Sequence, residues 1–238
     1  MVKNFFNISG DSVFYTIQGE GPSMGCPAIF LRLHFCNLAC SWCDTQYTWD
    51  RKRRDFWVEH EIWSVQKTKQ EIQKAWKCAD KNIPRRLVIT GGEPLLQKDY
   101  IDALIKIMPG WIFEIETNGT IQPTKLQLQK CQFNCSPKLR NSDNAKILRF
   151  REQVLKSLNG VKTVFKFIVT RSSDIDEIQK DFVKKIGIDA SKIIIMPQGT
   201  IPEELHRNAR KVAEKVKQKG WRLLSRLHIE LWGAKRRT

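Results

Sequence analysis

The sequence of 238 residues lacks several features that mark particular classes of protein. No apolar run reaches the roughly 18 residues that a membrane-spanning helix requires. The first residues, MVKNFFNISGDSVF, lack the long apolar core of a secretory signal, so we expect a cytoplasmic protein without a membrane segment. Low-complexity linkers and internal repeats are also missing. We therefore expect one domain over 1–238, long enough to bury a sizeable core.

The cysteines do not supply a complete zinc site. Cytosolic thiols stay reduced, so crowded cysteines there favour metal binding over disulfides. Structural zinc takes four ligands, but only Cys36, Cys40 and Cys43 of the seven cysteines are crowded together. His34, on the predicted strand before them, is the nearest candidate for a fourth ligand. The other cysteines follow no second metal-binding spacing, and we expect them to be small buried apolar residues: Cys26, Cys78, Cys131 and Cys135.

Acidic residues are scarce, with 25 Asp and Glu against 41 Lys and Arg, which gives a net charge of +16. Such a surplus is typical of nucleic-acid-binding proteins. Much of it is local, in RKRR at 51–54 and in a basic helix, strand and tail expected over 206–238. Leu205, Val212 and Val216 share one helical face, so the cations of that helix form its solvated side. We expect no requirement for nucleic acid, although an RNA or acidic partner stays open.

Strands alternate along the chain with helices of about 10–15 residues, which predicts parallel βαβ units. This pattern indicates an α/β fold with a mostly parallel sheet that curls into a complete or partial TIM-like barrel. We expect strands at 12–17, 27–35, 85–90, 111–119, 132–138, 163–169, 192–196 and 222–231. We expect helices at 65–79, 99–108, 145–158, 173–187 and 203–220.

Unusual polar motifs fall where predicted strands end. They are the cysteine loop CNLACSWCDT and the motifs TGGEP, ETNGT, SPK and MPQG. In α/β folds the carboxyl ends of the strands form the edge where ligands bind. These loops therefore predict a single site on one rim of the sheet.

Three thiolates from one loop can hold three corners of an iron–sulfur cubane and leave the fourth iron without a protein ligand. The CxxxCxxC spacing of Cys36, Cys40 and Cys43, with Trp42 before the last of them, resembles the radical S-adenosylmethionine superfamily. The glycines of TGGEP allow a backbone to approach a ligand closely, and this motif is also similar to that superfamily. The resemblance implies a barrel of the radical S-adenosylmethionine type and a 4Fe-4S cluster. It also implies that the open iron binds S-adenosylmethionine, whose cleavage yields a 5′-deoxyadenosyl radical.

FYTIQGEGPSMGCPAIFLRLHFC, CSWCDTQYTW, SPK, FKFIV and the basic C-terminus together resemble the 7-carboxy-7-deazaguanine synthase family over nearly the whole chain. The resemblance implies a magnesium-dependent lyase that contracts the ring of 6-carboxy-5,6,7,8-tetrahydropterin with loss of ammonia, toward queuosine and related 7-deazapurines. S-adenosylmethionine would be regenerated. It also implies a substrate-binding cap at 1–25, a homodimer, and an external electron donor of the flavodoxin or ferredoxin type.

Residue chemistry supports part of the site. Gln18 has donors and acceptors for a ring edge, and Arg32 has a planar fork that binds a carboxylate. Oxygen atoms of Asp44 and Thr45 suit magnesium, although both residues are also good helix caps. Glu116 ends a predicted strand and suits sugar hydroxyls.

The resemblance implies the roles of the remaining residues. The substrate would contact Ile17, Gln18, Gly19, Arg32, Thr90 and Thr238. S-adenosylmethionine would contact Trp42, Asp44, Gly92, Glu116, Ser136, Pro137, Lys138 and Gln198, and magnesium would bind Thr45. No residue is assigned as a catalytic base, and Glu20 and His34 stay open for that role.

Other interpretations remain. A second radical enzyme, an activase that makes a glycyl radical on a partner protein, would need neither magnesium nor a pterin. A basic nucleic-acid-binding protein with a structural metal would show zinc and salt-dependent RNA binding. A non-enzymatic electron carrier would not need TGGEP or an open iron.

Overall fold

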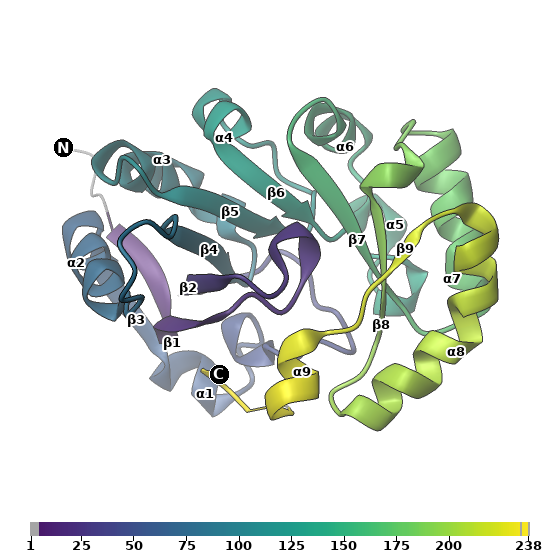
Figure 1. Ribbon diagram of the computed structural model, residues 1–238, viewed down its shortest axis with the longest axis horizontal. Helices are drawn as coiled ribbons and strands as arrows, with labels where there is room; N and C mark the ends of the chain where they lie inside the picture. Colours follow the sequence, from purple (N-terminus) through teal and green to yellow (C-terminus); the bar gives the residue numbers. More distant parts are fainter. Residues whose placement is uncertain (1–4, 234, 238) are drawn as a thin grey trace.

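A computed structural model describes residues 5–233 and 235–237 of the chain (Figure 1). In these residues nine strands form one sheet. The strands are β1 (Phe5–Ile17), β2 (Pro27–Leu33), β3 (His60–Ser64), β4 (Arg86–Gly91), β5 (Ile112–Thr117), β6 (Cys131–Cys135), β7 (Thr163–Val169), β8 (Ile193–Pro197) and β9 (Arg222–Leu223). Their order is β3-β1-β2-β4-β5-β6-β7-β8-β9, antiparallel at the β1 pairings and parallel from β2 onward. The predicted mostly parallel α/β sheet is confirmed.

The helices lie mainly along the outer, convex side of the curved sheet, as Figure 1 shows for α2, α3, α4, α6, α7 and α8. Their bounds are α1 (Arg54–Val58), α2 (Val65–Ala75), α3 (Lys98–Ile107), α4 (Lys125–Lys130), α5 (Lys146–Arg149), α6 (Glu152–Asn159), α7 (Ser172–Glu177), α8 (Pro202–Lys219) and α9 (Leu227–Trp232). Within the described chain the outermost strands, β3 and β9, do not pair with each other, so the barrel is partial.

Local sequence explains most of these elements. The central strands are nearly continuous apolar runs because helices and the barrel interior bury both faces, and every residue of β8 is buried. The Ser64 side chain caps α2 by accepting a hydrogen bond from the Lys67 amide. Helix α8 begins with Pro202 and is capped after Lys219 by Gly220, whose φ of 67° suits glycine. Each end of α8 therefore carries its own sequence signal.

Several predicted elements differ in the structure. The last predicted strand, 222–231, is wrong beyond Leu223, because its second half forms α9. The helix predicted over 145–158 breaks at Phe150, which is extended, and at Arg151, which is also not helical. The helix after Ser172 continues as a π-helical segment, Ile178–Lys184. The segment that forms α1 and β3 was not predicted.

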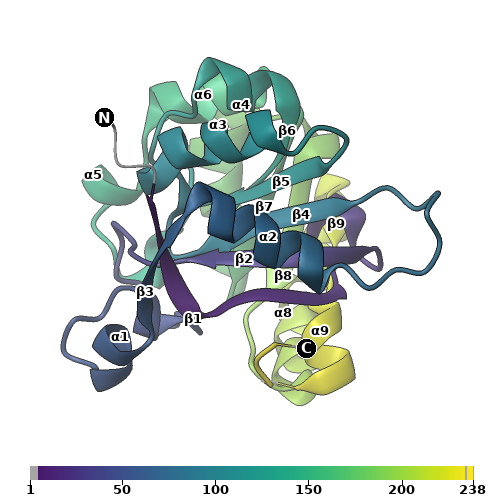
Figure 2. The ribbon, with the colours of Figure 1, turned by 90° about the vertical axis from the view of Figure 1, so that its left-hand side faces the viewer.

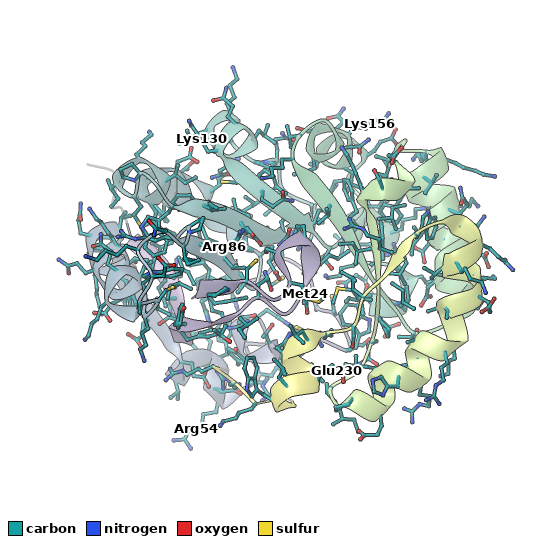
Figure 3. The ribbon with its side chains drawn as sticks, viewed as in Figure 1. Met24, Arg54, Arg86, Lys130, Lys156 and Glu230 are labelled. Carbon is teal, nitrogen blue, oxygen red and sulfur yellow. The ribbon has the colours of Figure 1, made fainter. Side chains whose placement is uncertain are left out.

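The surplus of cations lies largely in solvent. Figure 3 shows Arg54, Lys130 and Lys156 pointing outward from α1, α4 and α6. On α8 the apolar face predicted around Val212 and Val216 is buried, which confirms that the cations of this helix are on its outer side. No helix in the described part of the chain is long and apolar enough to cross a membrane.

Candidate functional site

A cavity of about 450 Å³ lies on the face of the sheet opposite the outer helices. The structure brings nearly all of the predicted site residues to its wall. They are Ile17, Gln18, Gly19, Arg32, Cys36, Cys40, Trp42, Cys43, Asp44, Thr45, Thr90, Gly92, Glu116, Ser136, Lys138 and Gln198. Pro137 is buried but does not line the cavity, and Thr238 lies outside the described residues.

The three crowded cysteines form one wall, named here the cysteine wall: Cys36, Cys40 and Cys43. Burial raises the pKa of the Cys36 thiol to about 12 and also raises that of Cys40. Within the described chain no three His, Cys, Asp or Glu side chains converge to hold a single metal ion. A cubane binds each thiolate on a different iron, so its ligands need only border one space. Coordination would also deprotonate these thiols.

Close backbone packing holds the cysteine loop against the end of β4. A Cβ atom on Gly91 would lie 2.0 Å from the Leu33 carbonyl oxygen, and one on Gly92 would lie 2.0 Å from that of Phe35. The Gly92 amide donates to the Leu33 carbonyl at 3.0 Å. Both glycines are therefore required by packing of the protein on itself, a reason that the sequence did not reveal. Phe35, at φ 78°, turns the chain sharply into the cysteine loop.

Glu93, which follows these glycines, ties two of the loops together. Its carboxylate is fully buried and accepts hydrogen bonds from Thr117 Oγ1 at 2.8 Å and from the Asn118 amide at 2.7 Å. Burial raises the pKa of this carboxyl. The glutamate of TGGEP thus positions the end of β5 beside the cysteine loop, a role that the sequence analysis missed.

A network of ion pairs also lines the cavity and is named here the charge wall: Glu20, Asp44, Glu116, Lys166 and Arg226. The Lys166 ammonium lies 2.6 Å from Glu20 and 3.2 Å from Glu116. The Arg226 guanidinium lies 2.9 Å from Glu20 and 2.7 Å from Asp44. Glu116 and Asp44, predicted to meet S-adenosylmethionine, therefore already have cationic partners.

The charge wall shifts the titration of its members. Burial disfavours the charged form of Glu20, but Lys166 and Arg226 hold its pKa well below the usual range. Burial raises the pKa of Glu116, with Lys166 acting in the opposite direction. Burial opposes the charge of Lys166, yet Glu116 and Glu20 raise its pKa. Lys166 interrupts the apolar strand FKFIV, and that interruption was the signal that could have identified it.

The C-terminal segment closes this side of the cavity. The Leu227 amide donates to the Gly19 carbonyl at 3.0 Å. A Cβ atom on Gly19 would lie 2.2 Å from His228 Nδ1, so only glycine fits there. The Gln18 side chain donates to Glu116 at 3.3 Å and accepts from the Glu20 amide at 3.1 Å. The loop predicted to read the substrate is thus held by α9 and the charge wall.

Arg32 is the most conspicuous unpartnered group. It lies beside Thr90 in the register of β2 and β4, and its guanidinium is 5.9 Å from the Phe14 ring. Its buried Nε has no hydrogen-bond partner among the described residues, and Thr16 Oγ1 and Trp49 Nε1 are in the same condition. All three residues line the cavity. Leaving a buried charged donor unsatisfied is costly, so this corner suits an anionic, hydrogen-bonding ligand.

The remaining predicted residues have partners of their own. Trp42 donates its indole N–H to the Asn141 carbonyl at 2.9 Å, and Lys138 donates to Ser136 Oγ at 3.0 Å. The backbone N–H of Gln198 donates to the Val169 carbonyl at 2.9 Å. Side-chain atoms of Trp42, Lys138 and Ser136 that were predicted to contact S-adenosylmethionine are therefore already hydrogen-bonded within the protein.

The predicted burial is confirmed for only two of the four cysteines outside the motif. Cys131 and Cys135 are buried, as predicted, whereas that prediction is wrong for Cys26 and Cys78, which are half-buried near the surface. His34 does not line the cavity, because it is buried behind the cysteine loop, with its Nδ1 2.9 Å from Ser9 Oγ.

Comparisons with known proteins agree on one family. Residues 31–130 match the model of the radical SAM superfamily. A 7-carboxy-7-deazaguanine synthase of Pyrobaculum aerophilum is 32% identical, covering 93% of each chain. One of Halobacterium salinarum is 31% identical, covering 93% of this chain and 89% of the relative. The crystal structure of QueE from Escherichia coli superposes with a TM-score of 0.68 at 26% identity, covering 94% of this chain and 95% of that one.

Proposed function

Since the chain belongs to the 7-carboxy-7-deazaguanine synthase family of radical S-adenosylmethionine enzymes, we propose that its cavity is where 7-carboxy-7-deazaguanine is made. The substrate is 6-carboxy-5,6,7,8-tetrahydropterin, which loses ammonia as its ring contracts. The observation that best supports this site is the meeting, at one cavity, of three cysteine thiols and an arginine whose buried Nε has no hydrogen-bond partner among the described residues.

Cys36, Cys40 and Cys43 are proposed to hold the 4Fe-4S cluster. When bound, the cluster supplies the electron that cleaves S-adenosylmethionine and starts the radical reaction. Gly92 and the loop at Ser136, Pro137 and Lys138 would position S-adenosylmethionine, together with backbone or side-chain atoms of Trp42, Asp44, Glu116 and Gln198. Because Glu116 and Asp44 are already paired, they would accept hydrogen bonds without a change of charge.

Arg32 would bind the substrate carboxylate, and Thr90 lies beside it in the register of the sheet. Ile17, Gln18 and Gly19 would hold the edge of the pterin ring, while α9 excludes water above them. Thr45 would be the protein ligand of a magnesium ion that keeps water and substrate oxygens as its other ligands. We also propose Thr238 as a substrate contact, a flavodoxin or ferredoxin as electron donor, and a homodimer of single-domain chains.

Anaerobic turnover tests the function. Reconstituted protein receives reductant, magnesium, S-adenosylmethionine and 6-carboxytetrahydropterin, and mass spectrometry follows 7-carboxy-7-deazaguanine. We expect product without stoichiometric loss of S-adenosylmethionine. Formation of 5′-deoxyadenosine alone would show that the substrate is wrong. Absence of both products, from protein with a full complement of iron, would overturn the function.

Magnesium is tested by its omission and by Thr45→Ala. We expect both to lower turnover and the variant to need more magnesium for half-maximal rate. Unchanged turnover in metal-free buffer with a chelator would remove magnesium from the proposal.

A further inference from the structure

A pair of exposed apolar side chains lies on α5, close to the cysteine loop. Ile147 and Leu148 are 73% and 49% exposed. Figure 2 places α5 on the same side of the molecule as α1, opposite the long loop that leads into β4. That is the side where the parallel strands end. Adjacent exposed apolar residues of this size at a functional edge indicate an interaction surface.

One side chain connects this pair to the cysteine wall. Asn144 Nδ2 donates to Cys40 Sγ at 3.3 Å, and Asn144 Oδ1 accepts from the Ala39 amide at 3.0 Å. The Asn144 carbonyl accepts from Nε of Arg149, the last residue of α5, at 3.1 Å. The turn before α5 is thus fastened to the loop that carries the thiols, and Ala39 is itself exposed.

The charges around the pair are mainly positive. Arg140, Lys146 and Arg151 are exposed, and Asp143 is the exposed acid of the same segment. Lys146 also pairs with Asp181 at 2.5 Å, and its ammonium lies 5.3 Å from the Phe150 ring. An apolar centre with a charged rim is the usual anatomy of a protein interface. On a chain of net charge +16, this rim favours an acidic partner.

We propose that this surface docks an acidic one-electron carrier protein of the flavodoxin type. The surface, named here the α5 surface, consists of Ala39, Ile147, Leu148, Arg140, Lys146 and Arg151. The reduced carrier gives up one electron and is oxidised by one electron, and the cluster on Cys40 and its neighbours is reduced by one electron. This inference rests on the proposed function, because only a chain that holds the cluster needs that electron.

The chain offers a matched control on α1. Trp57 and Val58 are 62% and 68% exposed and follow the cations at 51–54. Trp57 hydrogen-bonds to the Arg51 carbonyl, within its own segment. The double variants I147E/L148E and W57E/V58E therefore make the same change of charge at two exposed apolar pairs. Only the first pair lies on a helix that is hydrogen-bonded through Asn144 to Cys40.

Binding is measured first, by calorimetric titration of the holoenzyme with flavodoxin at low ionic strength. We expect I147E/L148E to raise the Kd at least about tenfold, and W57E/V58E to change it by less than about twofold. R140E/R151E should also raise the Kd and flatten its salt dependence. An unchanged Kd in I147E/L148E would overturn the proposal, as would a loss confined to W57E/V58E.

Turnover then separates the two proposals. With reduced flavodoxin, I147E/L148E should need at least about ten times more carrier for half-maximal rate, whereas its dithionite-driven rate should match that of the parent. If dithionite yields no product in any of these proteins, the proposed function fails. The Kd comparison would still decide whether the α5 surface binds the carrier.

Discussion

The cysteine wall and the charge wall face the same cavity but differ in how complete they are. On the charge wall each ion has a partner of opposite sign within 3.2 Å. On the cysteine wall burial raises the pKa of the Cys36 and Cys40 thiols, and Cys40 accepts a weak hydrogen bond of 3.3 Å from Asn144. Arg32, with its unpartnered Nε, resembles the cysteine wall in this respect.

The charge wall therefore stabilises the fold, whereas the cysteine wall and Arg32 have atoms that are available to bind a ligand. A buried charge left without its partner costs several kcal/mol, so the charge wall must be intact before any ligand binds. Substitutions on the cysteine wall and at Arg32 should abolish or strongly reduce product formation but leave the ligand-free fold nearly unchanged. Substitutions on the charge wall should destabilise the fold itself.

The largest effect is expected from Cys40→Ala, which should lose all bound iron and all product. The metal-free variant should lose only about 1 kcal/mol of unfolding free energy, because little volume is removed. Iron analysis and chemical denaturation measure the two quantities. Cys131→Ala is the matched control, since Cys131 is equally buried but lies outside the cavity. A full complement of iron in Cys40→Ala would break the ligand assignment.

Lys166→Met tests the charge wall. Removing the ammonium leaves the buried Glu116 carboxylate without its cationic partner. We therefore expect a loss of about 3–5 kcal/mol in the free energy of unfolding of the metal-free protein. Lys166→Met/Glu116→Gln should recover part of this loss, because the uncompensated charge is gone. The exposed pair of Lys215 and Asp176 gives the control, and Lys215→Met should cost at most about 1 kcal/mol. Equal losses of unfolding free energy in the two lysine variants would show that the charge wall stabilises the fold no more than an exposed ion pair does.

Sequence reasoning found the cysteine wall more readily than the charge wall. The cysteines and TGGEP are short local motifs, and apolar runs predicted the strands β4 to β8. Lys166 pairs with Glu20 across 146 residues and Arg226 does so across 206, so no local pattern reveals either pair. The same long-range contacts explain why 227–232 forms a helix against Gly19 instead of the predicted strand.

Arg32→Ala should lower product formation without lowering the free energy of unfolding, in contrast to Lys166→Met. Product formation should fall at least about thirtyfold, since losing a buried charge pair with the substrate costs about 2–5 kcal/mol. The unfolding free energy of the ligand-free protein should stay unchanged or rise, because an unsatisfied buried donor is removed. Iron content and S-adenosylmethionine binding serve as controls. Arg32→Lys keeps the charge without the planar fork and should recover only part of the rate. Unchanged turnover in Arg32→Ala would exclude this residue from the substrate site.

The smallest effect concerns the titration of His228, which packs against Gly19, next to Glu20 of the charge wall. Burial lowers the pKa of His228, with Glu20 and Asp44 opposing this shift and Arg226 and Lys166 adding to it. As the pH falls below about 6.5, the unfolded chain therefore takes up a proton before the folded chain does, and stability is lost. One such group gives a slope of at most about 1.4 kcal/mol per pH unit. Denaturation of the metal-free protein between pH 7.5 and 5 should show a smaller slope in His228→Asn than in the parent. An identical slope in the two proteins would show that the charge wall does not respond to pH through His228.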